Sequence, residues 1–222
     1  MYDNTYQSPG ANKAVTRPHQ TITMTAMWDD IKRILDTYQP SDEIKSRKAT
    51  ALEGAQSAVI VPLFMVAEEI GILIIGRSDH VKLHRGQMGF PGGMMEDKDD
   101  GDLLRTAVRE TDEELGIFSD QIDILGKLKT RKTYTTGIVV TPFVGSIPFP
   151  YTFSPDPMEV KSMHTASLVQ LLNTVQGKDN QFDLPPPVYT IDERPVWGLT
   201  ASILAELAQV LEPVLKIDSS HD

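Results

Sequence analysis

A single α/β or α+β domain is the fold class that the sequence predicts, from three observations. Strand-like apolar segments alternate along the chain with segments of helical periodicity. The chain has 222 residues, enough for one domain with a substantial core. No internal repeat divides it. We therefore expect one domain over residues 21–222, preceded by a loose polar tail over residues 1–20.

The expected elements follow from periodicity and from the positions of glycine and proline. Helical spacing predicts helices over residues 26–38, 102–115, 168–175 and 199–211. Strand-like runs cover residues 58–66, 70–76, 122–129 and 137–147. Clusters of glycine or proline predict loops over residues 86–93, 148–157 and 185–187. Gly116 is expected at the end of the second helix, where glycine is favoured.

The composition argues against several classes of protein. The absence of cysteine excludes disulfides, zinc–thiolate sites and cysteine nucleophiles. A net charge of −10 argues against binding to duplex nucleic acid. The longest apolar run, residues 70–75, falls far short of the ~20 residues of a membrane-spanning helix, and no secretory signal is evident. We expect a cytoplasmic protein that acts on a small molecule, with no nucleic-acid or membrane partner.

An acidic segment in the second expected helix is the first candidate site. Glu110, Glu113 and Glu114 occupy positions i, i+3 and i+4, so their carboxylates gather on one side of the helix. Like charges in one patch repel unless cations intervene, and hard divalent ions such as Mg²⁺ or Mn²⁺ suit oxygen ligands. Arg109 could pair with one of the glutamates and hold its rotamer. The alternative is an ordinary solvated acidic face.

A glycine-rich segment over residues 86–93 precedes this helix. Its glycines leave the backbone open to close approach by a ligand or a metal. Taken alone, such a segment is an ordinary turn more often than a site. Together, in this order and at this spacing, the segment and the acidic helix form a specific pattern.

This pattern resembles the Nudix box, G-x5-E-x7-R-E-U-x-E-E-x-G-U, where U is apolar. The first glycine is matched by Gly93, and the second half by Arg109, Glu110, Glu113, Glu114, Gly116 and Ile117. Two residues more than in the pattern lie between Gly93 and Arg109, and Thr111 stands where an apolar residue is expected. Gly101 occupies the position of the middle glutamate, for which either Asp99 or Asp102 could substitute.

The resemblance implies a fold, a reaction and a site. The fold is an α/β/α sandwich with a mixed sheet, and the reaction is metal-dependent hydrolysis of a pyrophosphate bond with Mg²⁺ or Mn²⁺. The implied metal ligands are the carboxylates of Glu110, Glu113 and Glu114 and the carbonyl of Gly92. The base for the attacking water stays open between Glu110 and Glu159, because acids on a later loop serve this role in some relatives.

Residues 74–93 are similar to the coenzyme A pyrophosphatase branch, whose signature is roughly L-L-T-x-R-S-x3-R-x3-G-x3-F-P-G-G. Gly76 stands for the threonine and Lys82 for the second arginine. Counting later landmarks, the likeness covers about residues 57–212. It implies coenzyme A or a derivative as substrate, with 4′-phosphopantetheine and 3′,5′-ADP as products. Arg77, Lys82 and Gly93 are the implied substrate contacts, and only the arginine can bind phosphate in bidentate fashion.

Several alternatives stay open at this stage. The substrate could be ADP-ribose, NADH or another nucleoside diphosphate derivative, and a non-catalytic Nudix-fold binding module is a third hypothesis. Lys127, Lys129 and Arg131 would share one strand face and either contact the substrate or protect a sheet edge. Trp197 is expected in the core. The sequence leaves open whether the chain forms a homodimer.

Overall fold

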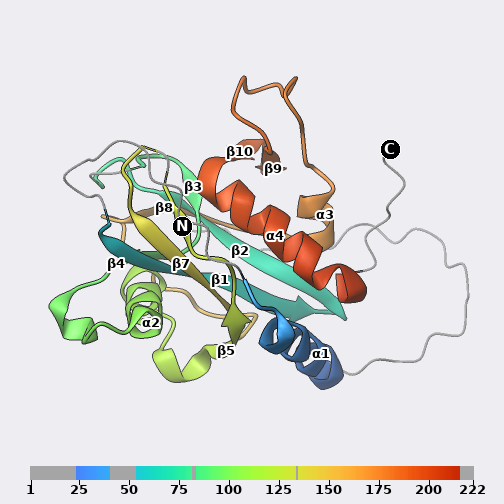
Figure 1. The fold of residues 1–222 in the computed structure, drawn as a ribbon, viewed down its shortest axis with the longest axis horizontal. Helices are drawn as coiled ribbons and strands as arrows, with labels where there is room; N and C mark the ends of the chain where they lie inside the picture. The colour runs from blue at the N-terminus through green and yellow to red at the C-terminus, as the bar shows by residue number, and fades with distance from the viewer. Residues whose placement is uncertain (1–23, 41–53, 82–83, 134, 216–222) are drawn as a thin grey trace, which may run out of the picture.

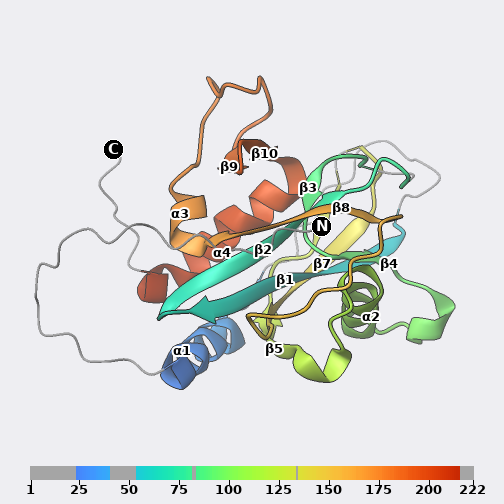
Figure 2. The same cartoon turned by 180° about the vertical axis from the view of Figure 1, so that it is seen from behind.

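A mixed sheet forms the centre of the structure, and helices cover both of its faces (Figures 1 and 2). The computed structural model describes residues 24–40, 54–81, 84–133 and 135–215. The expected tail and Lys82 lie outside these residues. The arrangement confirms the predicted α/β/α sandwich.

The sheet has eight strands among the described residues, in the central order β3-β2-β1-β7-β5. In addition, β4 pairs with β1, β6 with β7 and β8 with β2. The β1–β7 pair is parallel and the other pairs are antiparallel. Their bounds are β1 Gln56–Val66, β2 Glu69–Arg77, β3 Met88–Gly89, β4 Gly92–Met94, β5 Asp123–Lys127, β6 Arg131–Lys132, β7 Val139–Ser146 and β8 Val160–Ser167.

The helices lie on opposite faces of this sheet. Helix α2 (Leu103–Leu115) covers one face, while α1 (Met24–Thr37), α3 (Leu168–Leu172) and α4 (Gly198–Leu215) cover the other. Figure 1 shows α4 lying across the near face of the sheet, and Figure 2 shows the sheet in front of α4. A separate hairpin joins β9 (Tyr189–Ile191) to β10 (Arg194–Val196).

Alternation along β1 explains the two layers. Val61 and Leu63 point into the core that α1 and α4 share, whereas Ile60 and Phe64 point toward the side of α2. Successive side chains of a strand face opposite sides, so a strand covered on both faces must be apolar throughout. This is why the first two expected strands read as nearly continuous apolar runs.

Helix α4 is the one helix in the described part of the chain that is long and apolar enough to cross a membrane. The criteria are length and composition alone, and the core helix of a soluble protein meets them as well. Its Glu206 is buried and accepts hydrogen bonds from the Tyr38 hydroxyl at 2.7 Å and the Lys129 backbone at 2.8 Å. Arg131 pairs with the same carboxylate. These contacts join the end of α1 to α4 and to the segment between β5 and β6.

Three features of the fold differ from the expectation. Residues 86–93, expected to be a loop, contain β3 and the start of β4, and the strand β8 and the hairpin β9–β10 were not expected. The strands β3 and β4 have two and three residues, so pairing with β2 and β1 creates them rather than any side-chain pattern. In β8, exposed and half-buried polar residues interrupt the apolar pattern that would signal a strand.

The contact between α1 and the sheet can be tested at Gly126. A methyl group there would collide with Leu35 on α1. We expect Gly126→Ala to lower the free energy of unfolding by about 1–3 kcal/mol, because an overpacked core forces side chains or backbone to move. Gly177→Ala is the matched control, since a methyl group there meets open space. Urea unfolding curves measure both, and equal stability of the two variants would contradict this packing of α1.

Candidate active site

Helix α2 begins and ends at residues suited to those positions. The Asp102 carboxylate accepts hydrogen bonds from the backbone N–H groups of Leu104 at 2.9 Å and Arg105 at 3.3 Å, which caps the N-terminus. Gly116 adopts the left-handed conformation at φ 68 and ends the helix, as the sequence predicts. The apolar side of α2 packs against β1, which turns its glutamates toward β4.

Two of the three helix glutamates meet an acid from a distant part of the chain. Carboxylate oxygens of Glu110, Glu114 and Glu159 all lie within 4.8 Å of one another. Glu159 directly precedes β8, and its carbonyl accepts a hydrogen bond from the Ser78 N–H at 2.8 Å. The pairing of β8 with β2 therefore carries Glu159 to the acids of α2. We refer to these three residues as the carboxylate cluster.

Glu113 does not belong to the carboxylate cluster in this structure. Its side chain is 53% exposed. One oxygen accepts a hydrogen bond from Lys98 at 3.1 Å and the other from Arg109 at 2.8 Å. The sequence places all three glutamates on one side of α2, but Glu113 lies at the rim while the other two are buried.

Arg109 connects these acids to a buried aspartate. Its guanidinium donates to Asp99 at 2.7 and 2.9 Å, and to Glu110 and Glu113 at 2.8 Å each. The Arg109 guanidinium holds the pKa of Asp99 well below its usual range. The two candidate aspartates therefore have different roles: Asp102 caps α2, and Asp99 fixes Arg109.

Two glycines allow β4 to lie directly on the buried carboxylates. The Gly92 N–H donates to Glu114 Oε2 at 2.8 Å. At Gly92, φ is 146 and a Cβ atom would collide with the Ala58 carbonyl oxygen, so a side chain is excluded there. A Cβ at Gly93 would collide with the Glu110 carboxylate. Gly92 is thus required by the close approach of β4 to β1, and Gly93 leaves room for the Glu110 carboxylate of α2.

Glu114 is a buried carboxylate with unusual electrostatics. Its side chain is 1% exposed, and this burial raises its pKa from the ordinary 4.5 to about 8. Arg77, at 3.5 Å, and the hydrogen bond from Gly92 oppose the shift only in part. Burial also raises the pKa of Glu110. Loss of water on burial and the nearby like charges thus disfavour ionisation of both acids.

The carboxylate cluster fits a hard divalent cation. Glu114 Oε1 is buried and accepts no hydrogen bond from the described residues. A buried oxygen without a hydrogen bond is costly unless some group satisfies it, and Arg77 at 3.5 Å offsets its charge only in part. Carboxylate oxygens are the ligands that Mg²⁺ and Mn²⁺ prefer, and a bound cation would offset the repulsion between the three acids.

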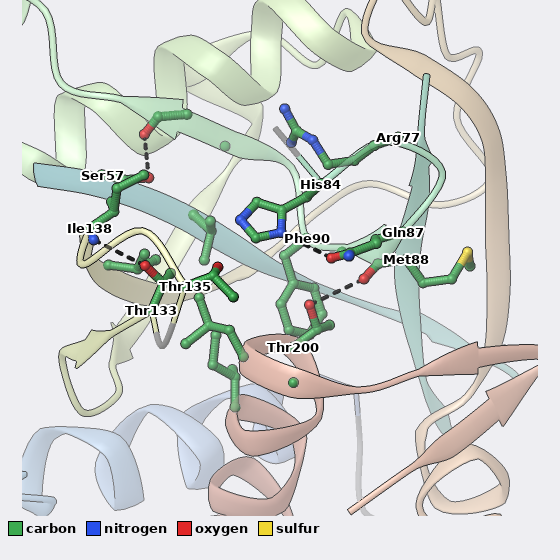
Figure 3. Close-up of a pocket in the computed structure, with 18 of the residues that line it drawn as sticks. Ser57, Arg77, His84, Gln87, Met88, Phe90, Thr133, Thr135, Ile138 and Thr200 are labelled. Atoms are coloured by element: carbon green, nitrogen blue, oxygen red, sulfur yellow. Dashed lines mark hydrogen bonds between the residues drawn. The ribbon is translucent and has the colours of Figure 1, made fainter. Parts of the chain in front are cut away.

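A pocket of about 320 Å³ opens beside this cluster (Figure 3). Arg77, Gly92 and Gly93 line it at the end next to the acids. His84 and Gln87 come from the loop before β3, and Figure 3 shows the His84 ring pointing into the pocket. The pocket therefore adjoins the cluster through Gly92 and Arg77, which both contact Glu114, and has room for the rest of a ligand bound there.

The walls of the pocket include residues that the sequence did not indicate. Trp197, expected in the core, is half-buried and lines the pocket instead, because the turn before α4 carries it to the pocket wall. Thr200 also lines the pocket and donates to the Met88 carbonyl at 3.2 Å. Lys127, Lys129 and Arg131 are not among the lining residues. Residues 196–200 are among the later landmarks of the resemblance, but nothing in them predicts that Trp197 or Thr200 lines a pocket.

Comparison with known proteins agrees with this geometry. Residues 54–181 match the family model of the NUDIX domain. An uncharacterized Nudix hydrolase NudL from Yersinia pestis (strain Pestoides F) is 31% identical over 180 residues, which cover 79% of this chain and 89% of the relative.

Solved structures with a similar fold come from several organisms. A C. elegans Ap4A hydrolase binary complex has a TM-score of 0.50 at 17% identity and covers 72% of this chain and 98% of its own. The NUDIX domain of Shewanella oneidensis NrtR, complexed with ADP ribose, has a TM-score of 0.50 at 16% identity, with coverages of 81% and 97%. A NUDIX hydrolase from Alicyclobacillus acidocaldarius reaches 0.51 at 15% identity, with coverages of 76% and 100%. These identities support the shared fold alone.

The buried charge of Glu114 predicts a pH-dependent effect on stability. Between pH 4.5 and about 8 the folded protein keeps a proton on Glu114 that the unfolded chain has released. Stability therefore falls as pH rises through this window, and the loss is complete above the folded pKa. We expect Glu114→Gln to raise the Tm of the metal-free protein by a few degrees at about pH 9 and much less at about pH 5.

Thermal melts in the presence of a chelator measure this effect. Asp120→Asn removes an exposed carboxylate of the short helix after α2 and serves as the control. A gain for Glu114→Gln that is the same at both pH values would contradict the assignment of a buried, strained charge.

Proposed function

The chain belongs to the NUDIX domain family and is a pyrophosphohydrolase, and from this premise we propose that it cleaves the pyrophosphate bond of coenzyme A or a derivative. The products would be 4′-phosphopantetheine and 3′,5′-ADP. One observation carries the proposal: the pocket next to the carboxylate cluster is lined by residues of the segment that resembles the coenzyme A signature. These residues are Arg77, Gln87, Phe90, Gly92 and Gly93.

Nudix hydrolases generally use divalent metal ions, and we propose Mg²⁺ or Mn²⁺ for this chain. Glu110 and Glu114 would supply buried ligands, and the Gly92 carbonyl a further one. We also propose Glu113 as a ligand at the rim of the site. To bind the ion, its carboxylate would give up the hydrogen bond that it accepts from Lys98. When bound, such an ion neutralises the pyrophosphate and lowers the pKa of an attacking water.

The base that takes the proton of the water is proposed to be Glu159. An oxygen of Glu110 accepts a hydrogen bond from Arg109 at 2.8 Å, which favours its charged form as a ligand. The side chain of Glu159 has no hydrogen-bond partner among the described residues, so its oxygens are available to a water. Glu110 is the alternative base.

Arg77 is proposed to bind the pyrophosphate itself. Its guanidinium lies 3.5 Å from Glu114 and lines the pocket, so it belongs to the reacting end of the site. A guanidinium can bind two phosphate oxygens at once. Gly93 would allow the substrate to approach the strand closely. Arg131 is less suited to contact substrate, because its guanidinium is already paired with Glu206.

Other Nudix substrates remain the competing hypothesis. The related NrtR domain was solved with ADP ribose, and the C. elegans enzyme is an Ap4A hydrolase. Both share the fold with this chain at low identity, and a shared fold does not fix the substrate. A non-catalytic binding module is disfavoured by the intact carboxylate cluster.

A substrate panel with product identification tests the proposal. We expect coenzyme A to have a higher kcat/KM than dephospho-coenzyme A, ADP-ribose, NADH or Ap4A, and mass spectrometry to detect 4′-phosphopantetheine and 3′,5′-ADP. Turnover should require added Mg²⁺ or Mn²⁺ and stop with EDTA. Glu114→Gln should lose on the order of 100-fold in kcat through the loss of a ligand. A preference for another dinucleotide would discard coenzyme A, and full turnover in EDTA would discard the metal mechanism.

Arg77 offers a second prediction, about which phosphate it binds. If it serves the pyrophosphate, Arg77→Ala should lower kcat/KM by a similar factor, roughly 10- to 150-fold, for coenzyme A, dephospho-coenzyme A and ADP-ribose. Arg77→Lys should recover only part of the loss, because it keeps the charge but not the bidentate geometry. Steady-state kinetics on the three substrates measure this. A loss confined to coenzyme A would assign Arg77 to the 3′-phosphate instead.

A further inference from the structure

The charges of the pocket are few, and their positions are informative. The whole chain carries a net charge of −10, yet none of the described residues that line the pocket is acidic. Among these described lining residues, Arg77 and His84 are the ones that can carry a positive charge. Arg77 already faces Glu114 at the reacting end of the site. A phosphate monoester elsewhere on the substrate therefore needs a partner other than Arg77, and His84 is the one that the pocket offers.

The imidazole ring of His84 is oriented toward a ligand. Its Nδ1–H donates to Gln87 Oε1 at 3.0 Å. This hydrogen bond fixes the ring and leaves Nε2 at the other side, where no described residue bonds to it. Figure 3 shows the ring pointing into the pocket with Arg77 beside it. From Nε2 a protonated imidazole can donate a charge-assisted hydrogen bond to a phosphate oxygen.

Backbone hydrogen bonds hold His84 and Arg77 in a fixed relation. The Arg77 N–H donates to the Gln87 carbonyl at 3.0 Å, and the Gly86 N–H donates to the Arg77 carbonyl at 3.1 Å. The Gln87 N–H donates to the His84 carbonyl at 3.2 Å, and His84 itself has a positive φ of 56. The turn thus closes on the end of β2.

We propose that His84 binds a phosphate monoester of the substrate that is separate from the pyrophosphate, and so selects nucleotides with a 3′-phosphate. The inference deepens the proposed function and rests on it, since coenzyme A carries such a phosphate and ADP-ribose does not. It assigns the two cations of the pocket to two different phosphates, Arg77 to the scissile pyrophosphate and His84 to the monoester.

Coenzyme A and dephospho-coenzyme A form the decisive pair of substrates, because they differ only in the 3′-phosphate. We expect His84→Ala to lower kcat/KM for coenzyme A by about 10-fold or more, mainly through KM, and to change the value for dephospho-coenzyme A by less than about twofold. His84→Asn is the second variant, since asparagine tolerates positive φ and preserves the turn.

Two neighbouring variants serve as controls. His80→Ala removes an exposed imidazole from the same loop, and Arg85→Ala removes an exposed positive charge, yet neither residue lines the pocket. Both should leave the ratio of the two kcat/KM values unchanged. If Arg85→Ala reduces the ratio as much as His84→Ala does, a general field effect replaces the direct contact and the inference fails. Equal losses on both substrates in the His84 variants also overturn it.

Equilibrium binding separates this inference from the proposed function. Affinities for 3′,5′-ADP and for 5′-AMP are measured on the wild type and on both His84 variants. We expect the wild type to prefer 3′,5′-ADP, and the His84 variants to lose that preference. If coenzyme A is not cleaved but this pattern holds, the substrate proposal fails and the phosphate site stands. If coenzyme A is cleaved and the preference survives in both variants, His84 is not the phosphate contact.

Discussion

The close approach of β4 to helix α2 is the contact on which the site depends. Gly92 and Gly93 pair with Val59 and Ala58 of β1; a Cβ at Gly92 would collide with the β1 backbone, and a Cβ at Gly93 with the Glu110 carboxylate of α2. In return, the Gly92 N–H binds the buried carboxylate of Glu114. A carboxylate placed there is desolvated and under-bonded, which makes it unfavourable in the free protein and suited to a cation.

Two arginines face the carboxylates at this contact, Arg109 from the outer side and Arg77 from the inner side. On the outer side, Arg109 bridges Glu110 and Glu113 and is itself anchored by the buried Asp99. On the inner side, Arg77 opposes the charge of Glu114 only partly. Burial therefore disfavours the charged form of Glu114 in the free protein, and its Oε1 accepts no hydrogen bond from the described residues. A bound cation would stabilise the charged form of these carboxylates and offset the repulsion between them.

Segments from four regions of the chain build the pocket. Strand β1 supplies Val59, the turn after β2 supplies His84, the segment before β7 supplies Thr133, and the start of α4 supplies Thr200. The hairpin β9–β10, which leads into α4, is tied to β8 because His164 hydrogen-bonds Asp192 at 2.6 Å and Ser162 at 2.8 Å. Helix α2 and the sheet thus fix the carboxylate cluster, while peripheral connections shape the pocket. This division explains how one fold can serve many substrates.

The sequence by itself determined the central elements and the chemistry. Apolar runs identified β1 and β2, and the spacing of Glu110, Glu113 and Glu114 identified an acidic helix ended by Gly116, because these patterns depend only on local periodicity. Tertiary structure decided which acids meet. Strand pairing brings Glu159 close to Glu110 and Glu114. Glu113 stays exposed at the rim of the site. Burial raises the pKa of Glu114. Desolvation and contacts between remote segments depend on packing in three dimensions, so no local pattern in the chain could encode them.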